Sequence, residues 1–402
     1  MCEPWSHPNS RPSCSSSART DRLLSQRVTH ELRAWLGCSV ADVRRPAHIW
    51  GRKATAEPGT RPRYALHAEP LSLPAVFARV IEGPVVIPFS FEVYPPRSAA
   101  AAAELPATID ALAAAGPEFI SVTFGAGGSS RDSSLEALRY VRENTAVKPM
   151  AHLTCVGSSH AEAGLLIRRF LDAGITSFLA LRGDLPHDVD GAAAPLGDLG
   201  SAGELVQLIH RVQAERVPYT EVQLPGLPHA AQVDRHRAKV TVAVAAFPNG
   251  HPRSRFDGQD VDALLAKQAA GATLAITQLF FEAEHYLAFV DRARAAGVTI
   301  PILPGVMPVT SASRLRRIAE LAELTPPPRL LAALEAAGTD EQRFAVGVEN
   351  AVALASAVTA GGAPGIHLYT FNRHEAVLTV LAELGLVPAS APKYGTRNKE
   401  SA

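Results

Sequence analysis

A carboxylate stands inside an apolar run of the chain, at Glu92 in VVIPFSFEV, just before the stop made by Pro95 and Pro96. The run is rich in β-branched and aromatic residues, which indicates a buried strand. A buried Glu that stays charged without a partner costs several kcal/mol, so a folded chain rarely keeps one there without a use. Glu92 therefore either points to solvent or lies at a site where its proton is used, as in general acid catalysis.

Polar side chains also stand at the ends of other apolar runs. Considered singly, each is most often a satisfied core group or a solvated strand edge. Seven runs that all end in this way favour one shared site instead. The residues at these ends are Glu92, Thr123, His152, Thr154, Arg182, Asp184, Phe247, His251, Gln278, Asn372 and Arg373.

Two loops after these runs have compositions suited to ligands. In FGAGGSSRD, three glycines allow a close backbone approach, and their N–H groups could hold a phosphate, although a plain flexible turn fits equally well. LRGDLP places Arg182 and Asp184 two residues apart, which suits a heteroaromatic ring with donors and acceptors. The chain has no P-loop, no metal-type His/Cys/Asp spacing and no Ser nucleophile elbow, so we expect neither metal-dependent nor serine-dependent hydrolysis.

Eight β-rich runs would position these side chains. Most are near-continuous in Val, Ile, Leu, Phe and Ala, as in parallel strands that are covered on both faces. Amphipathic stretches such as GLLIRRFLDAG separate them, with Gly at the expected helix C-cap. This alternation predicts an α/β fold, a (β/α)8 TIM barrel whose active site lies at the C-terminal mouth. The runs are VVIPFSFEV, FISVTFGA, KPMAHLTCV, SFLALRGD, KVTVAVAAFP, LAITQLFF, ILPGVMPV and GIHLYTFN.

The chain divides into three segments by composition. Residues 1–80 are rich in Arg, Ser and Pro with little periodicity, and we expect a poorly ordered extension there. The barrel is expected over residues 84–388, followed by a C-terminal tail at 389–402. Within the barrel, the Pro- and His-rich residues 217–237 predict an irregular surface insertion, and residues 310–364 have room for two or three helices.

The bulk composition is that of a globular enzyme with a large core. Hydrophobic residues make up 47% of the 402 and charged residues 19%. Lys plus Arg equals Asp plus Glu at 39 each, so no net field predicts nucleic acid as a partner. No apolar run is long enough to span a membrane. Four cysteines without metal spacing fit a reducing, cytoplasmic setting.

Phrases in these runs resemble those of the methylenetetrahydrofolate reductase family, in the same order, over roughly residues 84–388. The resemblance implies the catalytic barrel alone, as in bacterial members, with FAD as cofactor. NADH or NADPH would reduce the FAD, and hydride would then pass to 5,10-methylenetetrahydrofolate to give 5-methyltetrahydrofolate. The matching phrases are FEVYPPR, FISVTFGAGGSSR, AHLTC, ALRGDLP, AAFPNGHP, AITQLFF, PILPGVMPV and HLYTFNR.

Glu92 matches the general acid of this family. It would protonate N10 of the folate and so open the five-membered ring to an iminium that accepts hydride from flavin N5. Apolar surroundings disfavour a charged carboxylate, so such an acid keeps its proton to a higher pH. Asp184 matches a carboxylate beside the flavin ring and the pterin, where it would orient the folate and tune the flavin.

The resemblance also implies binding residues. Lys267 and His251 are the expected partners of the FAD phosphates, and Thr123 would also touch the nicotinamide. Gln278 matches a pterin contact, and Arg373 a contact to the benzoyl-glutamate part of folate. The positions that match FAD contacts are Thr123, Phe124, Ala126, His152, Arg182, Gly183, Asp184, Ala202, Phe247, His251, Asp260 and Lys267.

Some positions depart from the family pattern. Ala263 and Ala266 replace polar or basic residues that face the FAD phosphates in some members, which predicts weaker FAD retention. Arg314 stands in place of a folate-contacting Gln and could pair with the glutamate tail. Ile318 replaces an aromatic residue that stacks on NADH, which leaves the choice of nucleotide open.

Three alternatives stay open beside a flavin-dependent reductase. The first is direct hydride transfer from NAD(P)H to the same folate without flavin. The second is a proline dehydrogenase-like flavoprotein on the same barrel, and the third is a folate-binding barrel without catalysis. In each folate-based case we expect a small-molecule partner, neither nucleic acid nor membrane, and a homo-oligomer.

Overall fold

The computed structural model describes residues 87–124, 129–183, 197–216, 219–224, 227–233, 240–251 and 254–388. The predicted extension at 1–80 and the predicted tail at 389–402 lie outside these residues, so those two boundaries stay predictions. Within the described residues, no helix is long and apolar enough to cross a membrane.

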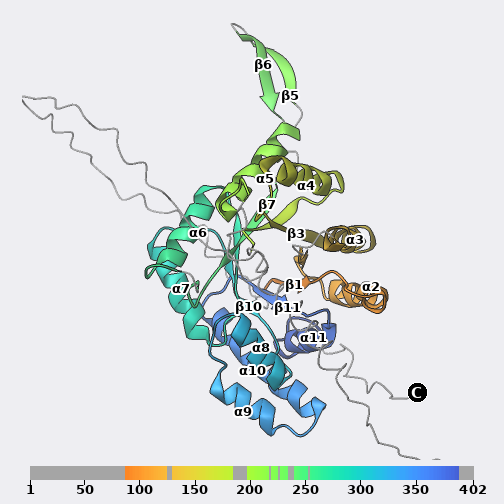
Figure 1. Cartoon of the computed structure of the whole chain (residues 1–402), viewed down its shortest axis with the longest axis vertical. Helices are drawn as coiled ribbons and strands as arrows, with labels where there is room; N and C mark the ends of the chain where they lie inside the picture. Colours follow the sequence, from red (N-terminus) through yellow and green to blue (C-terminus); the bar gives the residue numbers. More distant parts are fainter. Residues whose placement is uncertain are drawn as a thin grey trace, which may run out of the picture. The chain divides into compact units, whose positions relative to one another are not determined.

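A parallel sheet closes into a barrel (Figure 1), with the strand order β10-β11-β1-β2-β3-β4-β7-β8-β9. β9 and β10 are two halves of one strand interrupted at Pro304, so the pairings β8–β9 and β10–β11 close a ring of eight strand positions. All eight predicted runs form these positions, which confirms the (β/α)8 prediction. The strands are β1 (Phe89–Val93), β2 (Phe119–Val122), β3 (Lys148–Thr154), β4 (Ser177–Leu181), β7 (Thr241–Ala246), β8 (Leu274–Thr277), β9 (Ile302–Leu303), β10 (Gly305–Val306) and β11 (Ile366–Tyr369).

Helices follow the strands and cover the outer face of the barrel (Figure 1). Three of them, α8 to α10, lie between β10 and β11, as predicted for the long connection after the seventh strand. The helices are α2 (Ala99–Ala114), α3 (Ser129–Asn144), α4 (His160–Asp172), α5 (Ala202–Arg216), α6 (Gln259–Ala269), α7 (Ala283–Ala295), α8 (Ala312–Leu321), α9 (Pro328–Ala336), α10 (Asp340–Ala360) and α11 (His374–Glu383).

The insertion between α5 and β7 is not irregular, and in this respect the sequence prediction is wrong. β5 (Tyr219–Leu224) and β6 (Leu227–Val233) pair as an antiparallel hairpin. Pro225 and Gly226 separate the two strands in the sequence, and these residue types are typical of tight turns.

The alternation of side chains along β1 decides which of them face the barrel interior. Successive residues of a strand point to opposite faces. Phe89, Phe91 and Val93 join the large core between the sheet and the helices, so Ser90 and Glu92 point into the barrel. Other strands fill that interior by the same alternation, with Phe119, Met150, Leu179, Leu181, Ala243, Ile276 and Leu303.

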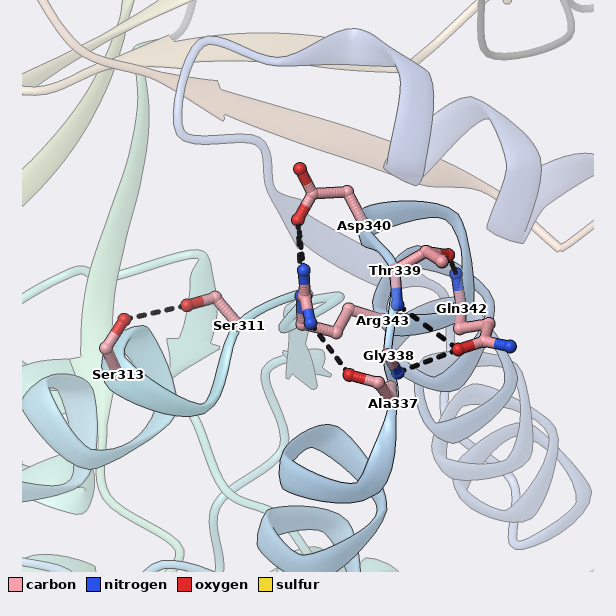
Figure 2. Close-up of polar contacts among 8 residues, drawn as sticks. All are labelled: Ser311, Ser313, Ala337, Gly338, Thr339, Asp340, Gln342 and Arg343. Atoms are coloured by element: carbon pink, nitrogen blue, oxygen red, sulfur yellow. Dashed lines mark hydrogen bonds and ion pairs between the residues drawn. The ribbon is translucent and has the colours of Figure 1, made fainter.

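Side-chain caps fix where the helices after β10 begin. Thr339 and Gln342 form a reciprocal capping box at the start of α10, with each side chain accepting from the other's backbone N–H at 3.2 Å (Figure 2). Ser311 caps α8 and accepts from the N–H of Arg314 at 3.4 Å. Figure 2 also shows the hydroxyl contact between Ser311 and Ser313. The cap holds Arg314 in the first turn of its helix.

Candidate active site

Glu92 lies inside the barrel and is almost enclosed, with its side chain only 12% exposed. Its Oε2 atom is 3.5 Å from Nε2 of His152 on β3 and 3.8 Å from Nε2 of His367 on β11. Both imidazoles are buried. Of the two readings of Glu92, the structure therefore selects the interior one: an acid held between two histidines.

His152 is neutral at pH 7. Burial lowers its pKa to about 4, against the opposing influence of the Glu92 carboxylate, while His367 lowers it further. Its contact with Glu92 is therefore not a charged pair near neutral pH. Neither ring nitrogen of His152 has a hydrogen-bond partner among the described residues, and Nε2 faces the Glu92 carboxyl.

His367 and Ser90 extend this group deeper into the barrel. A hydrogen bond of 2.7 Å joins Ser90 Oγ to His367 Nδ1, and the His367 ring stacks on Phe119 at 5.7 Å. Sequence reasoning missed both polar residues because it considered only the strand ends. The signal was present in the alternation of GIHLYTFN, where His367 falls between Ile366 and Leu368.

Tyr369 is the cross-strand neighbour of Glu92 and a second residue that sequence reasoning missed. Its hydroxyl donates to the backbone carbonyl of Thr277 at 2.7 Å. Burial, and after it the charge of Glu92, raises the pKa of Tyr369 well above its usual value, so the phenol stays neutral. A Cβ on Gly305 would lie 2.6 Å from the Tyr369 hydroxyl, so this glycine is required for the packing under the acid.

Four of the predicted FAD residues come together beyond the end of β7. Phe247 and His251 have ring centroids 4.8 Å apart. Ala202 at the start of α5 packs on Phe247. Lys267 of α6 places Nζ 5.9 Å from the Phe247 ring centroid and donates to the carbonyl of Ala245 at 2.9 Å. The group combines an aromatic face with a buried cation, which suits a ligand that carries both a ring system and phosphates.

Arg182 and Gly183 follow β4 in a tight arrangement. The Arg182 side chain is 2% exposed, and its Nε donates to the Gly183 carbonyl at 3.3 Å. Gly183 has φ +86° and no room for a Cβ, which would meet Val156 at 2.7 Å. Asp184 and Ala126, both predicted at the site, lie outside the described residues.

Phe124 points away from the barrel interior. Its ring packs edge-on against Phe170 of α4 at 6.1 Å, in the core between sheet and helices. Any contact of Phe124 with a cofactor would therefore come from its backbone. Thr123 stays at the strand end, where its N–H donates to the Val93 carbonyl at 3.0 Å and its own carbonyl accepts from Ser134 Oγ at 2.9 Å.

Asp260 supplies a buried carboxylate in the first turn of α6. Its side chain is 6% exposed, and its Oδ2 lies 3.8 Å from Arg292 Nη2 without a hydrogen-bond partner among the described residues. Oδ1 of Asn249 is also buried and unsatisfied within the same set. Both residues line a cavity of about 650 Å³. Buried polar atoms without hydrogen-bond partners beside a cavity of this size fit the binding of a polar ligand such as a dinucleotide.

The predicted substrate residues lie on three elements. Gln278 follows β8, and its Oε1 accepts from the N–H of Leu279 at 2.7 Å. Arg314 is in the first turn of α8, with its guanidinium 5.5 Å from the Phe371 ring centroid. Arg373 is the N-cap residue of α11. Among the described residues there is no group of three or more His, Cys, Asp and Glu side chains that could hold a metal.

The fold and the site together define a (β/α)8-barrel protein with an acid enclosed inside the barrel and, at the end of β7, an aromatic face with a buried cation. The family model for methylenetetrahydrofolate reductase matches residues 79–385, and the chain belongs to this family.

Individual relatives agree with this assignment. The 5,10-methylenetetrahydrofolate reductase of Salmonella typhimurium is 31% identical over 300 residues, which are 74% of this chain and 91% of the relative. Methylenetetrahydrofolate reductase (NADH) 1 of Arabidopsis thaliana is 31% identical over 303 residues. This chain spans 49% of the length of the plant relatives it matches.

Proposed function

We propose that the chain reduces 5,10-methylenetetrahydrofolate to 5-methyltetrahydrofolate with NADH or NADPH, through bound FAD. The observation that carries the proposal is the enclosure of Glu92 between His152 and His367 inside the barrel, on a chain that belongs to this reductase family. An acid in such a place can deliver a proton to a ring nitrogen of a substrate at the mouth.

Glu92 acts as the general acid. Its carboxyl proton passes to N10 of the folate, the bond from N10 to the bridging carbon breaks, and an iminium remains at N5. Hydride then adds to the bridging carbon, which becomes the methyl group. FAD, when bound, supplies that hydride from flavin N5.

The buried histidines hold the acid in place and can exchange hydrogen bonds with its carboxyl group. Neutral His152 can donate or accept a hydrogen bond at the Glu92 carboxyl without adding charge. Ser90, His367 and Glu92 form a continuous polar path from the barrel interior, with separations of 2.7 and 3.8 Å. After proton delivery, this path can rearrange its hydrogen bonds around the carboxylate.

The cofactor would be held by the residues at the ends of β2, β3, β4 and β7 and on the neighbouring helices. Lys267 and His251 would meet its phosphates, and Phe247 with Ala202 would form an apolar wall. Asp260 would accept hydrogen bonds from hydroxyl groups. His152, Arg182, Gly183 and the backbone at Thr123 and Phe124 would line the flavin side, together with Asp184 and Ala126.

The substrate residues complete the assignment. Gln278 would hydrogen-bond the pterin, and Arg314 and Arg373 would face the glutamate end of the folate. Assembly as a homo-oligomer and a cytoplasmic location remain predictions from the sequence.

Stopped-flow measurement of the two half-reactions tests the proposal. In Glu92→Gln, reduction of bound flavin by NAD(P)H should persist, whereas oxidation of reduced flavin by 5,10-methylenetetrahydrofolate should slow about 10²- to 10⁴-fold, the usual contribution of a placed general acid. Equal loss of both half-reactions would contradict the role of Glu92. Full turnover by a protein without flavin absorbance would point to direct hydride transfer instead.

A further inference from the structure

Ser121 on β2 is a fully buried serine whose hydroxyl has no hydrogen-bond partner among the described residues. Its neighbours Ile120 and Val122 point into the core between the sheet and the helices, so Ser121 points into the barrel. Buried hydroxyl groups normally have partners, because one without a partner destabilises the folded state. A role in catalysis or ligand binding is among the usual reasons for such an exception.

The place of Ser121 in the sheet sets it beside the proposed acid. In the parallel pairing of β1 and β2, Glu92 is the register partner of Ser121. Neighbouring strands lie about 4.8 Å apart, and both side chains point to the same interior. The unpartnered hydroxyl therefore lies next to the side chain of Glu92.

Ser121 belongs to a group of buried polar side chains around Glu92. The far side of the barrel interior, on β4, β7, β8 and β9, is filled by apolar side chains such as Leu179, Ala243, Ile276 and Leu303. A polar residue at position 121 thus follows the acid and not the general filling of the barrel. The buried polar group on β1, β2, β3 and β11 comprises Ser90, Ser121, His152, His367 and Tyr369.

Delivery of a proton by Glu92 leaves a negative carboxylate inside the barrel. A hydrogen bond donated to the charged form of an acid favours that form, and such bonds are stronger than those between neutral groups. The Ser121 hydroxyl has no bond to give up in the structure, so it can turn to this carboxylate as the charge develops. An interaction that strengthens on the way to the transition state lowers the barrier of the step.

We infer that Ser121 is a positioning residue for the proposed acid, and that its hydroxyl donates a hydrogen bond to the carboxylate that Glu92 becomes when its proton passes to N10 of the folate. The inference rests on the proposed function and deepens it. Ser121 keeps its own proton, and no covalent bond to it forms or breaks. The titratable groups that face the acid among the described residues are His152, His367 and Tyr369.

Stopped-flow kinetics of Ser121→Ala across a range of pH tests this. Reduction of bound flavin by NAD(P)H should be unchanged, whereas oxidation of reduced flavin by 5,10-methylenetetrahydrofolate should slow about three- to tenfold. The pH at which the second rate falls to half its plateau should rise by about one unit, because a weaker acid keeps its proton to a higher pH. The thermal midpoint should be no lower than that of the unaltered protein, since no hydrogen bond is lost.

The matched control is Ser177→Ala. Ser177 is a buried serine at the same level of the barrel but two strands away, in the register Ser121–Met150–Ser177. Both half-reactions and the pH dependence of this variant should equal those of the unaltered protein.

An unchanged folate rate with an unchanged pH midpoint in Ser121→Ala would overturn the inference. Equal slowing of both half-reactions with a lower thermal midpoint would show a packing role and would overturn it as well. If the unaltered protein does not reduce the folate, the proposed function fails separately. Infrared titration of the Glu92 carboxyl, with its band assigned by Glu92→Gln, then decides: a midpoint about one pH unit higher in Ser121→Ala supports the hydrogen bond, and an equal midpoint overturns it.

Discussion

Glu92 and Thr370 are joined across the β1–β11 pair: Thr370 Oγ1 donates to the Glu92 carbonyl at 2.6 Å, and the Thr370 N–H donates to the same carbonyl at 3.3 Å. The Thr370 hydroxyl also accepts from the N–H of Asn372 at 3.0 Å. One buried hydroxyl thus links the backbone of the proposed acid to the turn at Phe371 and Asn372.

Replacement of Thr370 by Val should destabilise the protein. The change keeps the side-chain shape but removes the hydroxyl that donates to the Glu92 carbonyl and accepts from the Asn372 N–H. The free energy of unfolding should therefore fall by about 1–3 kcal/mol. Chemical denaturation measures this. Thr379→Val is the control, because that hydroxyl only bonds the Glu375 carbonyl within α11, and the loss there should stay within about 0.5 kcal/mol. Equal losses in both variants would refute the linking role.

His152 should make stability depend on pH in mild acid. Its pKa of about 4 in the folded protein lies below the unfolded value of about 6.5, so between these values the unfolded chain binds more protons. Its contribution to stability is therefore complete above about pH 6.5 and is lost as the pH falls toward 4, by about 3 kcal/mol in all.

Denaturation of His152→Gln from pH 7 to pH 4 measures this term. The variant should lose less stability over that range than the unaltered protein. His160→Gln, at a largely exposed histidine near the start of α4, is the control and should follow the unaltered protein. If the two variants show the same slope, burial of His152 does not control the acid dependence.

Replacement of Gly305 by Ala should disturb the packing beneath Glu92. The new Cβ would stand 2.5 Å from the Thr277 carbonyl oxygen and 2.6 Å from the Tyr369 hydroxyl, both fixed by their mutual hydrogen bond. Overpacking of this kind costs about 1–3 kcal/mol. Gly338→Ala is the matched control, because the nearest atom to its new Cβ would be Gln342 Oε1 at 3.4 Å, an ordinary contact distance. Thermal melts should show a clear drop only for Gly305→Ala.

Replacement of Lys267 by Met should weaken FAD binding. The buried ammonium over Phe247 is the cation proposed for the phosphates, and loss of one charge-assisted contact corresponds to about a tenfold higher Kd. Quenching of flavin fluorescence on titration gives the Kd. Lys148→Met, at the exposed start of β3, removes the same charge at the opposite end of the strands and should bind FAD as the unaltered protein does. A normal Kd in Lys267→Met would assign the phosphates elsewhere.

The barrel could be predicted from the sequence because the same strand–helix pattern is repeated along the chain. Each strand is a short apolar run bounded by helical sequence, and the closing Gly residues mark where each helix ends. The hairpin of β5 and β6 was not predicted because its strands contain Pro, His, Glu and Gln, residue types that weaken the β pattern.

The candidate site was predicted only in part, for a reason of geometry. Strand ends show which residues reach the mouth, and Glu92, His152 and Arg182 were found in this way. Inward residues in mid-strand, such as His367, require the alternation to be followed along the whole strand. The same alternation explains why Phe124, two residues after β2, points outward into the core as Val122 does.

The interruption between β9 and β10 at Pro304 limits how copies of this protein could associate. Because β9 is hydrogen-bonded to β8 and β10 to β11, the ring of strands has no free edge to which another chain could add a strand. Within the described residues, the only strands with an unpaired edge are those of the β5–β6 hairpin. Among the described residues, self-association through the barrel body would therefore use its helices and loops, and association by strand addition would use the hairpin.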